Sequence, residues 1–114
     1  MNKLIDLVKI WAHKKGILEN GWPRAQSEKT IEEVNELIEA VGFQSIGIEE
    51  FTNSKGKVVN TQEEIKDAIG DIMVTLIIQC EMQDLKLKDC LESAYDVISK
   101  RTGRMISGQF VKDE

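Results

Sequence analysis

The segment Lys66–Ile78, KDAIGDIMVTLII, constrains most strongly what this chain can fold into. It is apolar around nearly its whole circumference from Ile69 to Ile78, yet it contains Asp67 and Asp71 one helical turn apart. A helix of this kind is expected at the centre of a bundle or of an oligomer, because it has little polar surface to present to water. Burying an unpaired carboxylate is costly, so Asp71 should have a polar partner or a cation.

Four segments of the chain have the apolar spacing of helices. We predict helices at residues 2–15, 26–41, 61–82 and 87–101. Gly16 should end the first helix and Gly42 should cap the second, and Thr61 with Glu64 has the pattern of a capping box at the start of the third. We therefore expect an all-α fold, a four-helix bundle in a single domain of residues 1–114.

The connection between the second and third helices, residues 43–59, is long. Such connections are usually functional, mobile or folded into a small hairpin, and the sequence NSKG at residues 53–56 is suited to a turn. The third helix has more apolar circumference than one four-helix monomer can bury. We therefore expect the bundle to be completed by dimerisation or tetramerisation.

The charge of the chain limits its partners. It has 20 acidic and 15 basic residues and a net charge of -5, which argues against a protein that coats nucleic acid. Nucleotides are still possible substrates, because acidic sites bind them through Mg²⁺.

The sequence also favours a cytoplasmic protein with no membrane partner. The first residues lack the continuous apolar run of a signal peptide, and no segment has the length and purity of a membrane span. Cys80 and Cys90 are too few and wrongly spaced for a zinc site. We expect both to be reduced thiols.

Two predicted helices carry clusters of acidic residues. In the second helix, Glu33 and Glu36 lie about 60° apart and one turn apart in height. In the third helix, Glu64, Asp67 and Asp71 fall within an arc of about 60°. If the two helices pack in antiparallel fashion, these carboxylates converge and supply the hard oxygen ligands that suit Mg²⁺ or Mn²⁺.

Other interpretations of these acids stay open. The acidic face of the second helix suits a solvated surface with an ion pair between Lys29 and Glu33. Asp71 would also fit a core position satisfied by backbone groups or by a lysine. A di-iron site is excluded, because that site in helical bundles needs Glu-x-x-His motifs and the chain has a single histidine, His13.

The segments QSEKTIEEVNELIEA and AIGDIMVTLI resemble the two motif helices of the MazG-type all-α nucleoside triphosphate pyrophosphohydrolases. The order of the motifs, the spacer and the following AYDVISKRTGRM segment are also similar, so that the resemblance covers roughly residues 22–112. The chain looks like the short single-domain type found in Gram-positive bacteria and their phages. E-x-x-E alone is a weak motif, but E-E-x-x-E followed at this distance by G-D in an apolar helix is fairly specific.

The resemblance implies Mg²⁺-dependent hydrolysis of a (deoxy)nucleoside triphosphate to the monophosphate and pyrophosphate. It places Glu33, Glu36 and Asp71 on the metal, with Glu32 nearby as an accessory acid or water-positioner. Either Glu32 or Glu33 is then the catalytic residue that orients or deprotonates the water. The family usually has a glutamate three residues before the aspartate, where this chain has Ala68. We expect Asp67 to replace it as a metal ligand.

The resemblance also favours Lys29, Arg101 and Arg104 as the residues that neutralise the phosphates. Lys29 is thus a catalytic as well as a substrate-binding candidate. Further substrate-binding candidates are Trp22 and His13, in the part of the chain expected to cover the base, and Tyr95 through its hydroxyl. Trp11 lies on an apolar stripe and fits a core position.

Three rival functions remain at this stage. The first is a related enzyme on the same scaffold, a phosphoribosyl-ATP pyrophosphohydrolase or a dUTPase-like enzyme. The second, suggested by Ala68, is a catalytically weak nucleotide-binding regulatory module. The third is a helical interaction protein whose acids are merely solvated, for which Mg²⁺ would not change the melting temperature.

Overall fold

The computed structural model describes residues 2–113, most of which are helical. The expected all-α character is confirmed in this main feature, although short strands are also present. The chain divides into two compact units, Met1–Asp84 and Leu85–Glu114. Among the described residues, no helix combines the length and the apolar composition needed to cross a bilayer.

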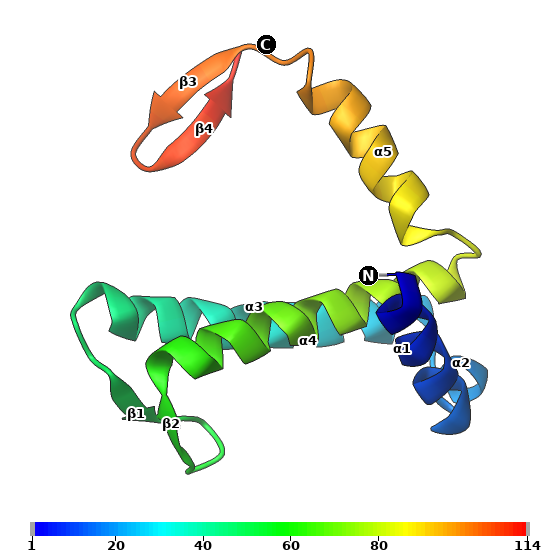
Figure 1. Ribbon diagram of the computed structural model, residues 1–114, viewed down its shortest axis with the longest axis horizontal. Coiled ribbons are helices and arrows are strands. Elements are labelled where there is room, and N and C mark those ends of the chain that lie inside the picture. Colours follow the sequence, from blue (N-terminus) through cyan, green and yellow to red (C-terminus); the bar gives the residue numbers. More distant parts are fainter. Residues whose placement is uncertain (1, 114) are drawn as a thin grey trace. The chain divides into compact units, whose positions relative to one another are not determined.

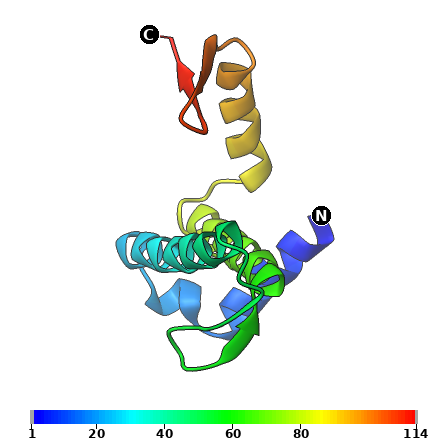
Figure 2. The same cartoon turned by 90° about the vertical axis from the view of Figure 1, so that its left-hand side faces the viewer.

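A pair of long antiparallel helices dominates the first unit (Figure 1). The helices of this unit are α1 (Asn2–Lys14), α2 (Ile17–Asn20), α3 (Pro23–Ser45) and α4 (Thr61–Met82). Helices α3 and α4 lie side by side, as the turned view also shows (Figure 2), and α1 and α2 contact α4. The two acidic segments of the sequence therefore face each other along one helix pair.

Helix α3 is longer at both ends than predicted. It begins at Pro23, which occupies the first helical turn, where its missing N–H is not needed. Gly42 does not cap it, because the helix continues to Ser45. Phe43, just beyond Gly42, packs its ring against Phe51 with the ring centroids 4.5 Å apart, and this contact holds the last turn in helical conformation.

Helix α4 has the predicted bounds but a different cap. Asn60, and not Thr61, is the N-cap residue, and its Oδ1 accepts a hydrogen bond from the backbone N–H of Glu63 at 3.0 Å. The Thr61 hydroxyl instead donates to the carbonyl of Ile48 at 2.7 Å. The prediction of a capping box at Thr61 and Glu64 was therefore wrong by one residue. The Thr61 hydroxyl is hydrogen-bonded to the connection before the helix and does not cap the helix.

The long connection contains a small antiparallel hairpin, one of the forms expected for it. Its strands are β1 (Glu50–Thr52) and β2 (Val58–Asn60), with Phe51 opposite Val59. Phe51 is buried in a core cluster with Ala40 of α3 and Ile65 of α4. Burial of this phenylalanine ties the hairpin to one end of the helix pair.

The second unit consists of α5 (Leu87–Ile98) and a hairpin of β3 (Gly103–Ile106) and β4 (Gln109–Lys112). Helix α5 ends three residues before the predicted Arg101. The hairpin was not predicted, although Ser107 and Gly108, with φ angles of 49° and 80°, form the kind of two-residue turn that favours one. None of the described residues in this unit is buried.

Candidate metal centre

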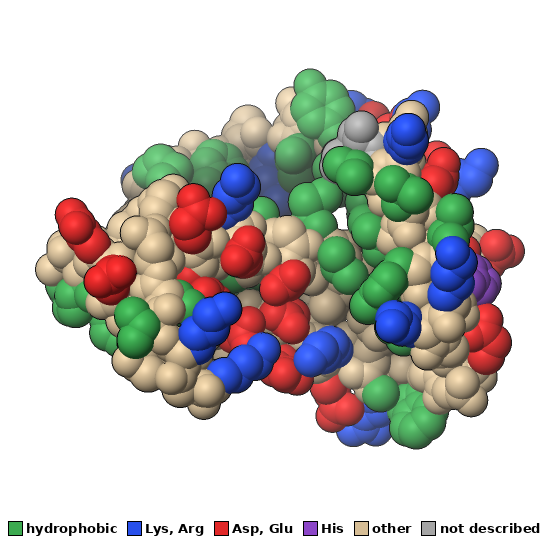
Figure 3. Space-filling view, turned by 60° about the horizontal axis from the view of Figure 1, so that its bottom comes forward, with side chains coloured by type: hydrophobic (Ala, Val, Ile, Leu, Met, Phe, Trp, Pro, Cys, Tyr) green, Lys and Arg blue, Asp and Glu red, His purple; other side chains and the backbone are tan. Residues whose placement is uncertain are grey.

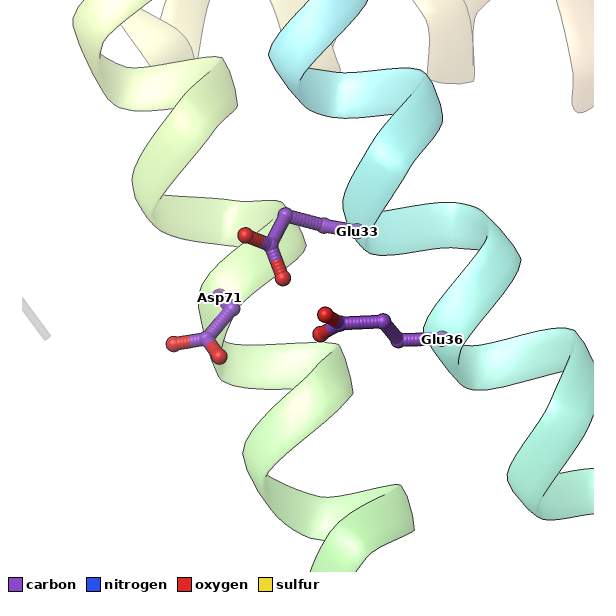
Figure 4. A group of neighbouring side chains, drawn as sticks. All are labelled: Glu33, Glu36 and Asp71. Carbon is purple, nitrogen blue, oxygen red and sulfur yellow. The ribbon is translucent and has the colours of Figure 1, made fainter. Parts of the chain in front are cut away.

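Three carboxylates converge between α3 and α4. Helix α3 places Glu33 and Glu36 one turn apart, and α4 presents Asp71 opposite them (Figure 4). Ligand oxygens of these three residues all lie within 4.8 Å of one another. The two helices pack in antiparallel fashion, which is the condition on which the predicted convergence depended, and this packing brings the three predicted metal ligands together.

Glu33 is the most enclosed of the three. Its side chain is 12% exposed, and its Oε2 is buried with no hydrogen-bond partner among residues 2–113. Burial raises the pKa of Glu33, and the nearby carboxylates of Glu36 and Asp71 raise it further. Lys29 opposes this effect from 3.8 Å away. A buried carboxylate oxygen without a donor needs a ligand to satisfy it.

Asp71 is exposed, although its apolar neighbours in the sequence suggested an enclosed position. It lies on the face of α4 that borders the acidic cluster. Partial burial raises its pKa first, and the charges of Asp67 and Glu36 add to this effect. Lys55 and Lys29 lower the pKa in return. The field at Asp71 is therefore set by groups from α3, α4 and the β1–β2 hairpin.

The chemistry of this donor set fits a hard divalent cation. All three groups are carboxylates, and like charges this close repel one another unless a proton or a cation intervenes. Oxygen-only donors suit Mg²⁺ or Mn²⁺ better than softer metals. The unpartnered Oε2 of Glu33 provides a further oxygen for such an ion.

A small cavity, here called the acidic cavity, adjoins Asp71 on the side of the β1–β2 hairpin. Its volume is about 100 Å³, and it is lined by Glu36, Glu39, Asn53, Ser54, Lys55, Glu64, Asp67 and Asp71. The space-filling view shows acidic side chains gathered on one face with basic side chains beside them (Figure 3). Lys55 was not considered as a site residue from the sequence, and Glu64 was placed in the acidic cluster of α4 without a role as a metal ligand.

Asp67 lines this cavity and lies outside the closest group of three carboxylates. Its role as a direct metal ligand stays a prediction. Ala68, which occupies the position of the expected family glutamate, is 1% exposed. A glutamate there would have to displace packed atoms, whereas Asp67 is exposed and acts on Asp71 through its charge.

A larger cavity, here called the apolar cavity, adjoins Asp71 on the other side. Its volume is about 490 Å³, and it is lined by Trp11, Ile17, Gly21, Trp22, Ala25, Gln26, Lys29, Glu33, Asp71, Val74, Thr75 and Ile78. Trp22 is 61% exposed and Trp11 is 47% exposed. Both indole rings are thus accessible at this cavity, and Trp11 is not enclosed in the core as its apolar stripe had suggested.

Lys29 connects the apolar cavity to the acids of α3. Its Nζ lies 3.1 Å from Glu32 and 3.8 Å from Glu33. The hydrogen bond to Glu32 raises the pKa of Lys29, so Lys29 is a cation at neutral pH. Glu32 has its side chain 59% exposed and stands next to the group of three carboxylates without being one of them.

A polar network that includes Gln26 and Thr75, two residues in the wall of the apolar cavity, was not predicted from the sequence. The Thr30 hydroxyl donates to Thr75 Oγ1 at 2.9 Å, and Thr75 donates to the Ile72 carbonyl at 2.7 Å. The buried Gln26 donates from Nε2 to the Thr75 carbonyl at 3.3 Å. The only signal in the sequence was Thr75 itself, a polar residue within an apolar run.

The remaining predicted site residues lie elsewhere. His13 lines neither cavity, and its ring nitrogens lie 3.1 Å from Glu19 and 3.4 Å from Glu81. The hydrogen bond to Glu19 is the main cause of its raised pKa. Tyr95, Arg101 and Arg104 are in the second unit. Their substrate-binding roles stay predictions.

Comparison with known proteins identifies the family. The model of the MazG nucleotide pyrophosphohydrolase domain matches residues 23–105, which is most of the chain. Searches of curated proteins and of solved structures found no significant match. The matched range contains Glu33, Glu36 and Asp71, the three converging carboxylates. The chain therefore belongs to the MazG nucleotide pyrophosphohydrolase domain family.

Proposed function

We propose that this protein hydrolyses (deoxy)nucleoside triphosphates between the α and β phosphates, releasing a nucleoside monophosphate and pyrophosphate. Membership of the family supports nucleotide pyrophosphohydrolase activity in general. The observation that carries the proposal for this chain is the position of Glu33, Glu36 and Asp71, which lie between an apolar cavity and an acidic one.

In this proposal Glu33, Glu36 and Asp71 hold Mg²⁺, for which Mn²⁺ could substitute, and Asp67 supports the site from the acidic cavity. The bound ion neutralises phosphate charge and lowers the pKa of water. Its affinity should rise with pH, because the raised pKa values of Glu33 and Asp71 make a proton compete with the cation.

In this proposal Glu32 acts on the water, and Lys29 orients Glu32 and contacts a phosphate. Glu32 is exposed, is next to Glu33 in the sequence, and accepts a hydrogen bond from Lys29 at 3.1 Å. A carboxylate in this position can orient a water molecule and take its proton. Lys29 also lines the apolar cavity, where its ammonium can contact a phosphate oxygen.

The apolar cavity is proposed to take the base. Trp22 offers an exposed indole ring at its wall, and stacking on an aromatic ring is tolerant of base identity. Gln26 and Thr75, which are joined by a hydrogen bond, add polar atoms to the same wall. The cavity is large enough for one base with its sugar.

We further propose that residues 1–114 work as one domain in a homodimer or homotetramer, in the cytoplasm and without nucleic-acid partners. The family match supports the first point, since it runs from the first unit into the second. Ile31 and Ile38 of α3 are 60% and 62% exposed, which supports a second copy as their cover. Tyr95, Arg101 and Arg104 keep their proposed roles in substrate binding.

The deciding experiment is an assay of pyrophosphate release. The purified protein should be incubated with each of the four dNTPs, the four NTPs, dUTP and phosphoribosyl-ATP, with Mg²⁺, with Mn²⁺ and with a chelator. We expect metal-dependent release of pyrophosphate from at least one triphosphate, and a higher melting temperature in the presence of Mg²⁺. If no compound yields pyrophosphate and Mg²⁺ leaves the melting temperature unchanged, the proposed function is wrong.

A further inference from the structure

The turn of the β1–β2 hairpin presents Lys55 in a defined backbone conformation. Asn53 Oδ1 accepts hydrogen bonds from the backbone N–H groups of Lys55 and Lys57, both at 3.0 Å. The Asn53 N–H donates to the Lys57 carbonyl and the Gly56 N–H to the Asn53 carbonyl, both at 2.9 Å. Gly56 has a φ of 78°, a conformation that glycine adopts without strain. The backbone of this turn is thus well determined by its own hydrogen bonds.

The hairpin is also fastened to the helix pair that carries the acids. Phe51 is 8% exposed, in a cluster with residues of α3 and α4. The Thr61 N–H donates to the Glu49 carbonyl at 2.8 Å, and its hydroxyl donates to the Ile48 carbonyl. These contacts hold both ends of the hairpin against α4. They keep Lys55 at the acidic cavity.

Lys55 lies near several carboxylates but forms an ion pair with none of those described. It lines the acidic cavity together with Glu36, Glu39, Glu64, Asp67 and Asp71. Its charge acts on Asp71. Within residues 2–113, however, its ammonium forms no ion pair at 4.0 Å or less. Its side chain is exposed, so the ammonium is available to a ligand that arrives at the cavity.

The arrangement of the two cavities on either side of Asp71 suggests which end of a bound nucleotide lies in each cavity. Asp71 borders both of them. A base in the apolar cavity leaves the triphosphate to cross Glu33, Glu36 and Asp71, and its far end then reaches the hairpin turn. The terminal phosphates carry the most negative charge of the nucleotide, and a lysine ammonium is a good point-charge partner for them.

We propose that Lys55 binds the terminal phosphates of the nucleotide and the pyrophosphate that leaves, from the side of the metal centre opposite Lys29. This inference rests on the proposed function. It adds a substrate-binding residue from an element outside both motif helices, and it makes the hairpin the part of the protein that distinguishes triphosphates from shorter nucleotides.

The test compares Lys55→Met with Lys57→Met. Lys57 has the same charge on the same hairpin and does not line the acidic cavity, so it is a matched control. Binding of a non-hydrolysable α,β-methylene triphosphate, of the corresponding monophosphate and of inorganic pyrophosphate should be measured by calorimetry with Mg²⁺. Circular dichroism melts should show both variants folded, because both side chains are exposed.

Lys55→Met should weaken binding of the triphosphate analogue and of pyrophosphate by about ten- to a hundredfold, the usual effect of losing a charge-assisted hydrogen bond. Binding of the monophosphate should not change. Lys57→Met should behave as wild type, and Lys55→Arg should restore most of the pyrophosphate affinity. In the hydrolysis assay, KM for the triphosphate should rise in Lys55→Met alone.

The possible failures are distinguishable. If wild-type protein releases no pyrophosphate from any nucleotide, the proposed function fails and this inference fails with it. If wild type is active and Lys55→Met binds pyrophosphate as tightly as Lys57→Met does, the role of Lys55 alone is overturned. A change in the Mg²⁺ requirement with unchanged pyrophosphate affinity would also overturn it, because Lys55 would then be only a counter-ion of the acidic residues.

Discussion

The apolar cavity and the acidic cavity meet at Asp71 but differ in nearly every other respect. The first is large, at about 490 Å³, and has two tryptophans in its wall. The second is small, at about 100 Å³, and is lined by five carboxylates. The first is built from α1, α2 and the segments of α3 and α4 next to them, the second from α3, α4 and the β1–β2 hairpin.

This difference follows from the antiparallel packing of α3 and α4. The beginning of α3 lies beside the end of α4, where α4 is apolar, and the later part of α3 lies beside the acidic beginning of α4. The distribution of acidic and apolar residues therefore changes along the length of each helix. A nucleotide is asymmetric in a similar way, with an aromatic base that can stack on rings at one end and charged phosphates at the other. The three carboxylates lie at the boundary.

We expect the largest loss of activity from a substitution at Asp71, the residue that borders both cavities. Asp71→Asn should lower metal-dependent pyrophosphate release by at least about a hundredfold, since even outer residues of metal sites cost 10–100-fold when removed. The metal-free protein should remain folded and be as stable or more stable, because repulsion between clustered charges is relieved. Enzyme assays and thermal melts with and without Mg²⁺ test this. Unchanged activity would remove Asp71 from the metal centre.

Asp67→Asn is the matched control for this substitution, because it removes the same charge one turn away on the same helix. Asp67 is not among the three closest carboxylates, and we expect it to lower activity less than Asp71→Asn does. Equal losses in the two variants would instead support Asp67 as a direct ligand.

Trp22→Ala tests the apolar cavity and should have an intermediate effect. Loss of stacking on one base costs about 1–3 kcal/mol, so KM for the nucleotide should rise by about tenfold. Pyrophosphate has no base, and its binding should be unaffected. A variant that loses affinity for pyrophosphate as well would show that the two cavities do not divide the substrate as proposed.

The smallest effect is expected in the pH dependence of stability without metal. Folding raises the pKa of Glu33 and of Asp71 above the ordinary values of 4.5 and 3.8, mainly through burial. The folded chain therefore binds more protons than the unfolded chain between the ordinary and the raised values, and its free energy of unfolding falls as pH rises through that window. Asp71→Asn should flatten this fall. Denaturant titrations at several pH values would measure it, and equal slopes in both proteins would contradict it.

Much of the fold could be predicted from the local pattern, and the errors have local causes. The apolar run from Ile69 to Ile78 predicted the helical character of α4, because a helix that is apolar on most faces leaves few alternatives. Its start was predicted from the capping pattern at Thr61, one residue after the N-cap Asn60. The end of α3 was placed too early at Gly42, since the ring contact between Phe43 and Phe51 joins residues of different elements. The hairpin at β3 and β4 depended on Ser107 and Gly108, a weak signal in a segment with no buried residue.

The candidate site was predictable to a similar degree. Helical spacing predicted one acidic face on each of the two helices, and the resemblance to the MazG-type enzymes selected Glu33, Glu36 and Asp71 from those acids. Lys55 was not identified, because it comes from a connection whose position relative to the helices depends on the burial of Phe51 and the bonds of Thr61. The substrate-binding role of His13 stays a prediction, and its ring nitrogens lie beside Glu19 and Glu81.

The sequence by itself determined that two helices would each carry a cluster of carboxylates, because helical periodicity is a local property of the chain. Only the tertiary structure decided which acids meet. Packing of α3 against α4 brings Glu33, Glu36 and Asp71 within 4.8 Å of one another, while Asp67 and Glu64 border the neighbouring cavity with Lys55. The physical reason is that the register of two helices and the placing of a hairpin depend on contacts between residues far apart in the chain.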